Sequence, residues 1–266
     1  MTTPDTPSAI DTTTPTTTPT TTPTTTATTT VPTTVLVTGA NKGLGRETAR
    51  ILAALGWTVW LGARDEGLGA AAAAALSHDG ADVRYLPLDV TDDASVAAAV
   101  ATVAAAGGLD VLINNAGISG SMRPVEETGP ADFLPVFGVN VLGPVRMTRA
   151  VLPLLRQSAH PRIVNVSSGM GSFAVTTDPA RFESTLQSLV YTSSKAALNM
   201  ITTQYAKALE GIQVNAVDPG YTSTDLNGYR GSQTVEEGVR AIVNAATVTR
   251  GGPTGTFTDA AGTVGW

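Results

Sequence analysis

A tyrosine and a lysine four residues apart are the residues of this sequence best suited to acid–base chemistry. Tyr191 and Lys195 lie in the segment 190–211, where apolar residues recur at three- and four-residue intervals, which predicts an amphipathic helix ending at Gly211. Side chains four residues apart on a helix are neighbours, so we expect the ammonium to lower the phenol pKa from its ordinary value of about 10. The alternative is an ordinary helix with a surface lysine and a half-buried tyrosine.

Composition sets the number of folded domains. With 266 residues, of which 42% are hydrophobic and 14% charged, the chain is long enough for one large core and short for two. Residues 1–33 differ from the remainder, because Thr and Pro dominate them without apolar periodicity. They are predicted to form a disordered, partly polyproline-like tail. One folded domain is expected at 34–266.

Charge and residue usage exclude several functional classes. The 22 acidic residues outnumber the 16 basic ones, which argues against a nucleic-acid partner. The sequence has no Cys and only two His, so no thiolate or histidine metal site is expected. It has neither a secretory signal nor an apolar run of about 18 residues, which predicts a cytoplasmic protein without a membrane partner.

The motif TGANKGLG follows a short β-branched run at 34–38 and precedes a helical pattern, so it is a glycine turn between a strand and a helix. Gly39, Gly43 and Gly45 would let the backbone approach a pyrophosphate at the helix N-terminus, where free N–H groups favour an anion. The pattern therefore predicts a nucleotide site. A tight structural turn is the alternative.

The end of the next strand, at 57–61, indicates which nucleotide is bound. An acid that binds the ribose diol is expected about 18 to 20 residues past the last glycine, where this sequence has Ala63, Arg64 and Asp65. Arg64 could grip a 2′-phosphate, and Lys42 supplies a second cation. The pattern predicts NADPH, with NADH the less favoured cofactor. Asp65 is interpreted as the N-cap of the following helix, and a ribose contact is the less favoured alternative.

Strand and helix patterns alternate along the rest of the chain. This alternation predicts a single doubly wound α/β domain with a seven-stranded parallel sheet flanked by helices. Prolines and glycines within the expected long helix 131–157 predict a kink near Asn140. The further strands are expected at 82–88, 109–113, 162–166, 212–217 and 255–259, and the further helices at 69–76, 94–106 and 236–247.

Six motifs, TGANKGLG, LDVTD, NNAG, NVSS, YTSSK and DPGYTST, occur in this order. From Thr34 to Trp266 the chain thereby resembles the classical short-chain dehydrogenase/reductases, and most of all their carbonyl reductase subgroup, which uses NADPH. The resemblance implies a Rossmann-type domain. It also implies an oxidoreductase that reduces a ketone or aldehyde to an alcohol, or runs the reverse, by hydride transfer with a tyrosine as general acid or base.

The resemblance implies a role for each of four catalytic residues. Tyr191 would donate the proton, while Lys195 would keep its pKa low and hold the nicotinamide ribose. Ser168 would donate a hydrogen bond to the substrate carbonyl, and its neighbour Ser167 would be structural. Asn140 would position a water bonded to the lysine, whereas spacing alone favours a buried asparagine with satisfied hydrogen bonds.

The same resemblance implies contacts along the cofactor. Asp89 would bind the adenine amino group, the Thr222 backbone the nicotinamide carboxamide, and the Thr224 hydroxyl the cofactor phosphates or amide. The full set of predicted cofactor-binding residues is Gly39, Asn41, Lys42, Gly43, Leu44, Gly45, Arg64, Asp89, Val90, Asn115, Ala116, Gly117, Tyr191, Lys195, Pro219, Gly220, Thr222 and Thr224.

The segment 169–188 departs from the family pattern because it lengthens the connection between Ser168 and Tyr191. We expect a loop with one short helix over the substrate side, and either a monomer or a low-order homo-oligomer. Two alternatives from other classes are a catalytically silent NADP-binding regulatory protein and an interaction protein that acts through its Thr/Pro tail. Retention of all four catalytic residues favours an enzyme with a small-molecule carbonyl or alcohol substrate.

Overall fold

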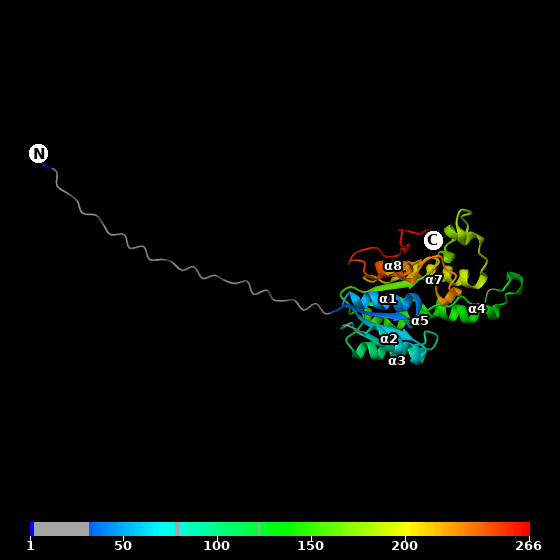
Figure 1. Cartoon of the computed structure of the whole chain (residues 1–266), viewed down its shortest axis with the longest axis horizontal. Coiled ribbons are helices and arrows are strands. Elements are labelled where there is room, and N and C mark those ends of the chain that lie inside the picture. Colours follow the sequence, from blue (N-terminus) through cyan, green and yellow to red (C-terminus); the bar gives the residue numbers. More distant parts are fainter. Residues whose placement is uncertain (3–31, 78–79, 122) are drawn as a thin grey trace. The chain divides into compact units, whose positions relative to one another are not determined.

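Seven parallel strands form one sheet in the order β3-β2-β1-β4-β5-β6-β7. The chain moves outward from β1 to β3, crosses back to β4 beside β1, and continues to the other edge. Figure 1 shows the chain coloured along its sequence, with most of the helices labelled. This topology confirms the predicted doubly wound α/β fold. The strands are β1 (Thr34–Thr38), β2 (Thr58–Ala63), β3 (Val83–Pro87), β4 (Val111–Asn114), β5 (Arg162–Val166), β6 (Gln213–Val217) and β7 (Phe257–Thr258).

The computed structural model describes residues 1–2, 32–77, 80–121 and 123–266. The tail predicted for residues 1–33 falls almost wholly within 3–31, outside the described residues. The sheet and its helices belong to a unit that runs from Pro32 to Trp266. Within the described segments, no helix is both long and apolar enough to cross a membrane.

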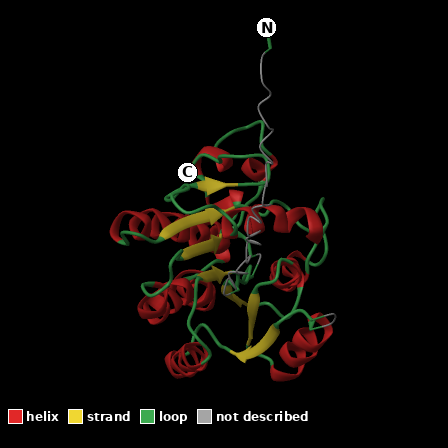
Figure 2. Ribbon diagram, turned by 90° about the vertical axis from the view of Figure 1, so that its left-hand side faces the viewer, coloured by secondary structure: helices red, strands yellow, loops and turns green. Residues whose placement is uncertain are grey.

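Helices cover both faces of the sheet, as Figure 2 shows. The α-helices are α1 (Gly43–Ala54), α2 (Glu66–Leu76), α3 (Asp93–Ala105), α4 (Pro130–Phe137), α5 (Gly143–Leu155), α6 (Phe173–Thr176), α7 (Leu189–Ala208) and α8 (Val235–Ala246). Shorter turns of helix are η1 (Val125–Glu127), η2 (Gly138–Leu142), η3 (Gly169–Gly171), η4 (Phe182–Thr185) and η5 (Asp225–Asn227).

Strand β1 shows why the core has two halves. Successive strand side chains point to opposite faces, so Val35 and Val37 pack on one side and Leu36 on the other. The first side also holds Leu52 from α1 together with residues of α2 and α8, and the second holds Met147 from α5 together with residues of α3. Because β1 is buried on both faces, it is a continuous apolar run.

The predicted kink near Asn140 is confirmed. The expected helix 131–157 is divided into α4 and α5 by the π-helix η2, which contains Asn140. At the junction, a Cβ on Gly143 would lie 3.0 Å from a Val90 methyl group, so the small residue lets the broken helix pack closely against the chain after β3. The break places Asn140 in the buried interior.

Three sequence predictions need correction. Helix α2 begins at Glu66, three residues before its expected start at residue 69. Helix α7 ends at Ala208, three residues before Gly211, whose φ of +78° belongs to the turn that follows. The segment 169–188 contains η3, α6 and η4 instead of one short helix. Ser172 begins α6 by accepting a hydrogen bond from the Val175 N–H, a local cap that an apolar-periodicity argument does not detect in so short a segment.

Candidate active site

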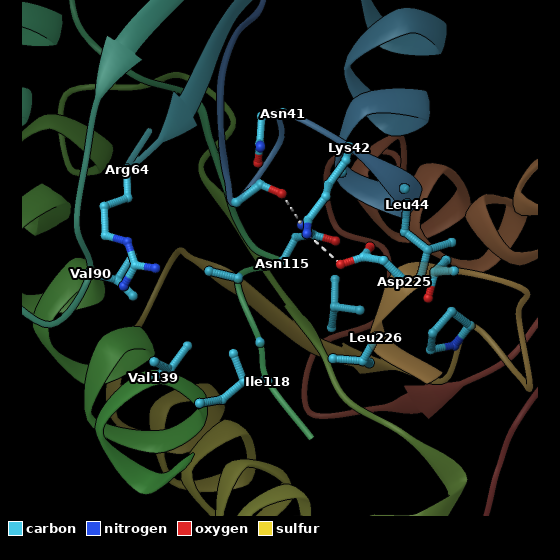
Figure 3. A pocket seen from close by; sticks show the side chains of 18 of the residues that line it. Asn41, Lys42, Leu44, Arg64, Val90, Asn115, Ile118, Val139, Asp225 and Leu226 are labelled. Carbon is cyan, nitrogen blue, oxygen red and sulfur yellow. Dashed lines mark hydrogen bonds and ion pairs between the residues drawn. The ribbon is translucent and has the colours of Figure 1, made fainter. Parts of the chain in front are cut away.

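A cavity of about 410 Å³ lies at the carboxyl ends of the central strands (Figure 3). The strand order reverses between β1 and β4, which is where open α/β sheets bind ligands. The predicted residues that line the cavity are Gly39, Asn41, Lys42, Gly43, Leu44, Gly45, Arg64, Asp89, Val90, Asn115, Ala116, Gly117, Tyr191, Lys195, Pro219 and Thr224.

The glycine turn is closely packed against the chain that follows β4. Gly39 has φ +62°, and a Cβ there would lie 2.9 Å from the Ala116 Cα. A Cβ on Gly45 would lie 2.5 Å from the Asn115 Nδ2, which donates to the Thr38 carbonyl at 2.8 Å. The turn therefore requires glycine at both positions.

The start of helix α1 is suited to an anion. Its N-cap residue, Lys42, makes no side-chain capping hydrogen bond, and the first turn carries no acidic residue. The first N–H groups of a helix have no partner within that helix, and the helix dipole adds positive potential there. A phosphate could therefore bind the backbone at this end of the cavity.

Two cations line the same part of the cavity. Arg64 follows β2, and its side chain is exposed; among the described residues it forms no ion pair. Lys42 forms an ion pair with Asp225 of η5, a partner that sequence analysis did not predict (Figure 3). Asp65 accepts a hydrogen bond from the Leu68 N–H at 2.8 Å, which confirms its predicted role as the N-cap of α2.

Tyr191 and Lys195 lie one turn apart on α7 and both line the cavity. The Lys195 Nζ is 5.7 Å from the centre of the Tyr191 ring and donates to the Val166 carbonyl at 2.9 Å. Tyr191 also shares a side-chain hydrogen bond with Ser168, at the end of β5. Residues of two separate sequence motifs, NVSS and YTSSK, thus meet at one end of the cavity.

The predicted lowering of the Tyr191 pKa is wrong for this arrangement. Burial raises the pKa of Tyr191 to about 12, against the opposing effect of the Ser168 hydrogen bond, and the Asp218 charge raises it further. Burial also lowers the pKa of Lys195 to about 8. The spacing of the two residues indicated their proximity correctly, but removal from water disfavours the charged form of each.

Both polar atoms of the Asn140 side chain form hydrogen bonds within the chain. Its Oδ1 accepts from the Ile118 N–H at 2.9 Å, and its Nδ2 donates to the Ile118 carbonyl at 2.9 Å and to the Ser194 hydroxyl at 3.0 Å. The side chain is 1% exposed. It therefore joins the chain after β4 to α7, as spacing alone favoured, and its role in holding a water stays a prediction.

Asp89 and Ser167 also have partners within the chain. Asp89 accepts hydrogen bonds from the Thr91 N–H at 2.8 Å and the Thr91 hydroxyl at 2.6 Å, while still lining the cavity. Ser167 donates to the Asn199 Oδ1 at 2.5 Å, which agrees with the structural role expected for it.

The cavity lining differs from the predicted site in both directions. Among the described residues, four predicted members do not line it: Asn140, Ser168, Gly220 and Thr222. Lining residues that were not predicted as site residues are Asp65, Leu68, Leu88, Ile118, Val139, Val166, Ser167, Asp225 and Leu226. Several of these residues are direct sequence neighbours of predicted ones, and that adjacency could have indicated that they line the cavity. Asp225 and Leu226 follow the last motif and reach the cavity through the turn η5.

Comparison with known proteins agrees with this geometry. Residues 33–235 match the family model described as short chain dehydrogenase. The chain is 39% identical over 221 residues to "Short-chain dehydrogenase anuI" of Penicillium roqueforti, covering 80% of this chain and 87% of that protein. It is 34% identical over 266 residues to (+)-neomenthol dehydrogenase of Arabidopsis thaliana, covering 79% of this chain and 90% of that protein.

A solved structure gives the corresponding three-dimensional match. The NADPH-bound carbonyl reductase from chicken fatty liver superposes with a TM-score of 0.79 and 31% identity, covering 89% of this chain and 100% of that one. The order of the motifs, the strand order and the cavity at the switch point all agree with this match. This chain belongs to the short-chain dehydrogenase family of oxidoreductases.

Proposed function

We propose that this protein is an NADPH-dependent oxidoreductase of the carbonyl reductase type, which reduces a ketone or aldehyde to an alcohol. The observation that carries the proposal is that one cavity joins the glycine turn and Arg64 to the Tyr191–Lys195 pair. A nucleotide-binding end and an acid–base end in one cavity suit the transfer of a hydride and a proton to the same substrate. The similarity to a carbonyl reductase solved with NADPH supports this choice.

The residues present fit a dinucleotide phosphate. Gly39 and Gly45 leave no room for a Cβ, so only backbone lines the cavity at these two positions. The start of α1 has no side-chain cap, and its N–H groups would bind an anion. The 2′-phosphate would be held by Arg64, with Lys42 as a second cation. Ala63, buried at the end of β2, provides no carboxylate to repel it.

NADPH, when bound, supplies the hydride for the reaction. Ser168 and Tyr191, which are joined by a hydrogen bond, would both direct their hydroxyl groups to the substrate oxygen and polarise the carbonyl. Tyr191 would then transfer its proton to the developing alkoxide. Lys195 supplies positive charge next to this phenol and would also hold the nicotinamide ribose.

The pKa values favour the reducing direction. With a pKa of about 12, Tyr191 is protonated at neutral pH, as a proton donor must be, yet it remains a stronger acid than an aliphatic alcohol. Alcohol oxidation would instead need the phenolate, which is scarce at neutral pH. Lys195, with a pKa of about 8, is mainly charged at pH 7.

The surroundings of the reacting end suit an apolar carbonyl compound. Ile118, Val139 and Leu226 line the cavity with apolar side chains (Figure 3). Such side chains favour the transfer of an apolar substrate from water.

The test is oxidation of NADPH, followed by its absorbance, with a panel of small ketones, quinones and bulky polycyclic ketones. We expect turnover with NADPH and much slower turnover with NADH. Tyr191→Phe should reduce turnover about 10²- to 10⁴-fold, the usual contribution of a positioned acid, while NADPH binding is nearly unchanged. Tyr205→Phe, on the same helix but outside the cavity, is the matched control.

Two results would contradict the proposal. Tight NADPH binding without turnover on any carbonyl in the panel would indicate a catalytically silent NADP-binding protein. Retention of more than about 1% of wild-type turnover in Tyr191→Phe would show that another group supplies the proton.

A further inference from the structure

The buried carboxylate of Asp218 links the two turns at the reacting end of the cavity. Asp218 follows β6, is 6% exposed, and accepts a hydrogen bond from the Gly220 N–H at 2.9 Å through Oδ1. It also accepts a backbone hydrogen bond from Gly169, and a Cβ on Gly169 would lie 2.8 Å from Oδ2. Since Gly169 follows Ser168 directly, the carboxylate connects the turn that carries Ser168 to the turn after β6.

Asp218 is also surrounded by charged and titratable groups from several elements. The Asp218 charge raises the pKa of both Lys195 and Tyr191 of α7. The charges of Glu183, in η4, and Asp259, after β7, act in turn on Asp218. The pKa of Asp218 is raised by burial, with smaller contributions from the two carboxylates, and is lowered by its backbone hydrogen bonds. Lys195 is the cation among these groups.

Lys195 needs such a charge because of its position. Its side chain is 4% exposed, and its hydrogen-bond acceptor is the neutral Val166 carbonyl. A buried ammonium without a nearby negative charge favours the neutral amine. Among the described residues, no carboxylate lies within ion-pair distance of Lys195, so Asp218 acts on it through space.

We propose that Asp218 is a positioning residue of this active site, which fixes the turn carrying Ser168 and keeps Lys195 in its charged form. The roles of Ser168 and Lys195 rest on the proposed function, whereas the electrostatic effect on Lys195 does not. Glu183 connects the same cluster to the segment 169–188, since its Oε1 lies near Gly169 and it pairs with Arg181 at 3.5 Å.

The chain has three lysines, Lys42, Lys195 and Lys207, so the Lys195 charge can be observed directly. The experiment is a pH titration of the full chain labelled with ¹³C at lysine Cε and followed by NMR, with Lys195→Met to assign the signal. In the wild type we expect Lys195 to titrate near pH 8. Asp218→Asn, which keeps an oxygen for the Gly220 N–H, should move this midpoint down by about 0.5 to 1 pH unit.

The matched control is Asp110→Asn. Asp110 also accepts a backbone hydrogen bond, from the Thr34 N–H at 2.8 Å, but it precedes β4 at the opposite end of the sheet. It should leave the Lys195 midpoint unchanged. An unchanged midpoint in Asp218→Asn would overturn the proposal.

Activity provides a second measurement. If the protein reduces carbonyls, the pH dependence of kcat in Asp218→Asn should shift in the same direction as the Lys195 midpoint, and a loss of kcat without that shift would overturn the proposal. The NMR result keeps its meaning even if no carbonyl is turned over, so failure of the proposed function is distinguishable from failure of this inference.

Discussion

Replacement of Arg64 by Asp tests the basis of cofactor choice. Arg64 lines the cavity after β2, and its guanidinium is available to a phosphate because it forms no ion pair among the described residues. An aspartate at this position would repel a 2′-phosphate and could bind the two hydroxyls of an unphosphorylated ribose. We therefore expect Arg64→Asp to weaken NADPH binding and to leave NADH binding unchanged or improved.

The magnitude follows from the exposure of the side chain. A hydrogen bond to a charged group contributes about 1.5 to 3 kcal/mol, and repulsion from the new carboxylate adds to the loss, giving roughly 2 to 4 kcal/mol. Arg64 is exposed, so solvent and salt screen its charge and the lower end of this range applies. A loss of about 2 kcal/mol corresponds to roughly 30-fold weaker NADPH binding.

The assay is titration of the protein with NADPH and NADH, each at low and at high salt. Arg149→Asp is the matched control because Arg149 is an exposed arginine of α5 outside the cavity, and the change in net charge is the same. Arg64→Asp should also show a weaker salt dependence of NADPH binding than the wild type. Equal NADPH affinity in Arg64→Asp and the control would refute the assignment of the phosphate site to Arg64.

Three further changes test other parts of the site. Asp225→Asn should strengthen NADPH binding a few-fold by releasing Lys42, because an exposed ion pair contributes only about 0 to 1 kcal/mol; weaker binding in a titration would contradict this. The Lys195 pKa of about 8 is below its ordinary 10.5, so unfolding takes up a proton between these pH values and the free energy of unfolding should rise with pH there. Between pH 7 and pH 10 we expect a rise of about 2 to 3 kcal/mol in the wild type relative to Lys195→Met, measured by urea unfolding. The same change between the two pH values in both proteins would refute this. Gly45→Ala should lower the melting temperature, because the new Cβ would lie 2.5 Å from the side-chain amide nitrogen of Asn115. Gly67→Ala is the control, since its Cβ would meet nothing closer than 3.6 Å, and equal melting temperatures of the two variants would contradict this.

The fold was predictable because local patterns and topology agree. The bounds of β1 and β5 are those expected from their apolar runs, and Asp65 caps α2 as its position before an alanine-rich helix indicated. The prolines and glycines around Asn140 predicted a break whose type, a π-helix, depends on packing against the neighbouring elements. In the segment 169–188 the local signals are caps of single turns, such as Ser172, and these are too short for periodicity to detect.

The pairing of Lys42 with Asp225 shows where sequence reasoning about the site ends. Lys42 belongs to the glycine turn, and Asp225 follows β6 in a turn that closes at Gly228 in the left-handed conformation. The motif assigned a charge to Lys42, but only the folded chain determines which opposite charge lies next to it. A long-range ion pair between exposed side chains has no periodic signal in the sequence.

The Tyr191–Lys195 pair makes the same point about electrostatics. Four-residue spacing places the two groups on one face of α7, and this was readable from the sequence. The sign of each pKa shift instead depends on how completely the surrounding chain removes the groups from water, which spacing does not determine. Burial raises the pKa of Tyr191, which favours its protonated phenol, and lowers the pKa of Lys195, which makes its ammonium lose a proton more readily. The charge of Lys195 then depends on Asp218, a residue on another strand end, and this is why the acid–base chemistry of the helix cannot be derived from the helix alone.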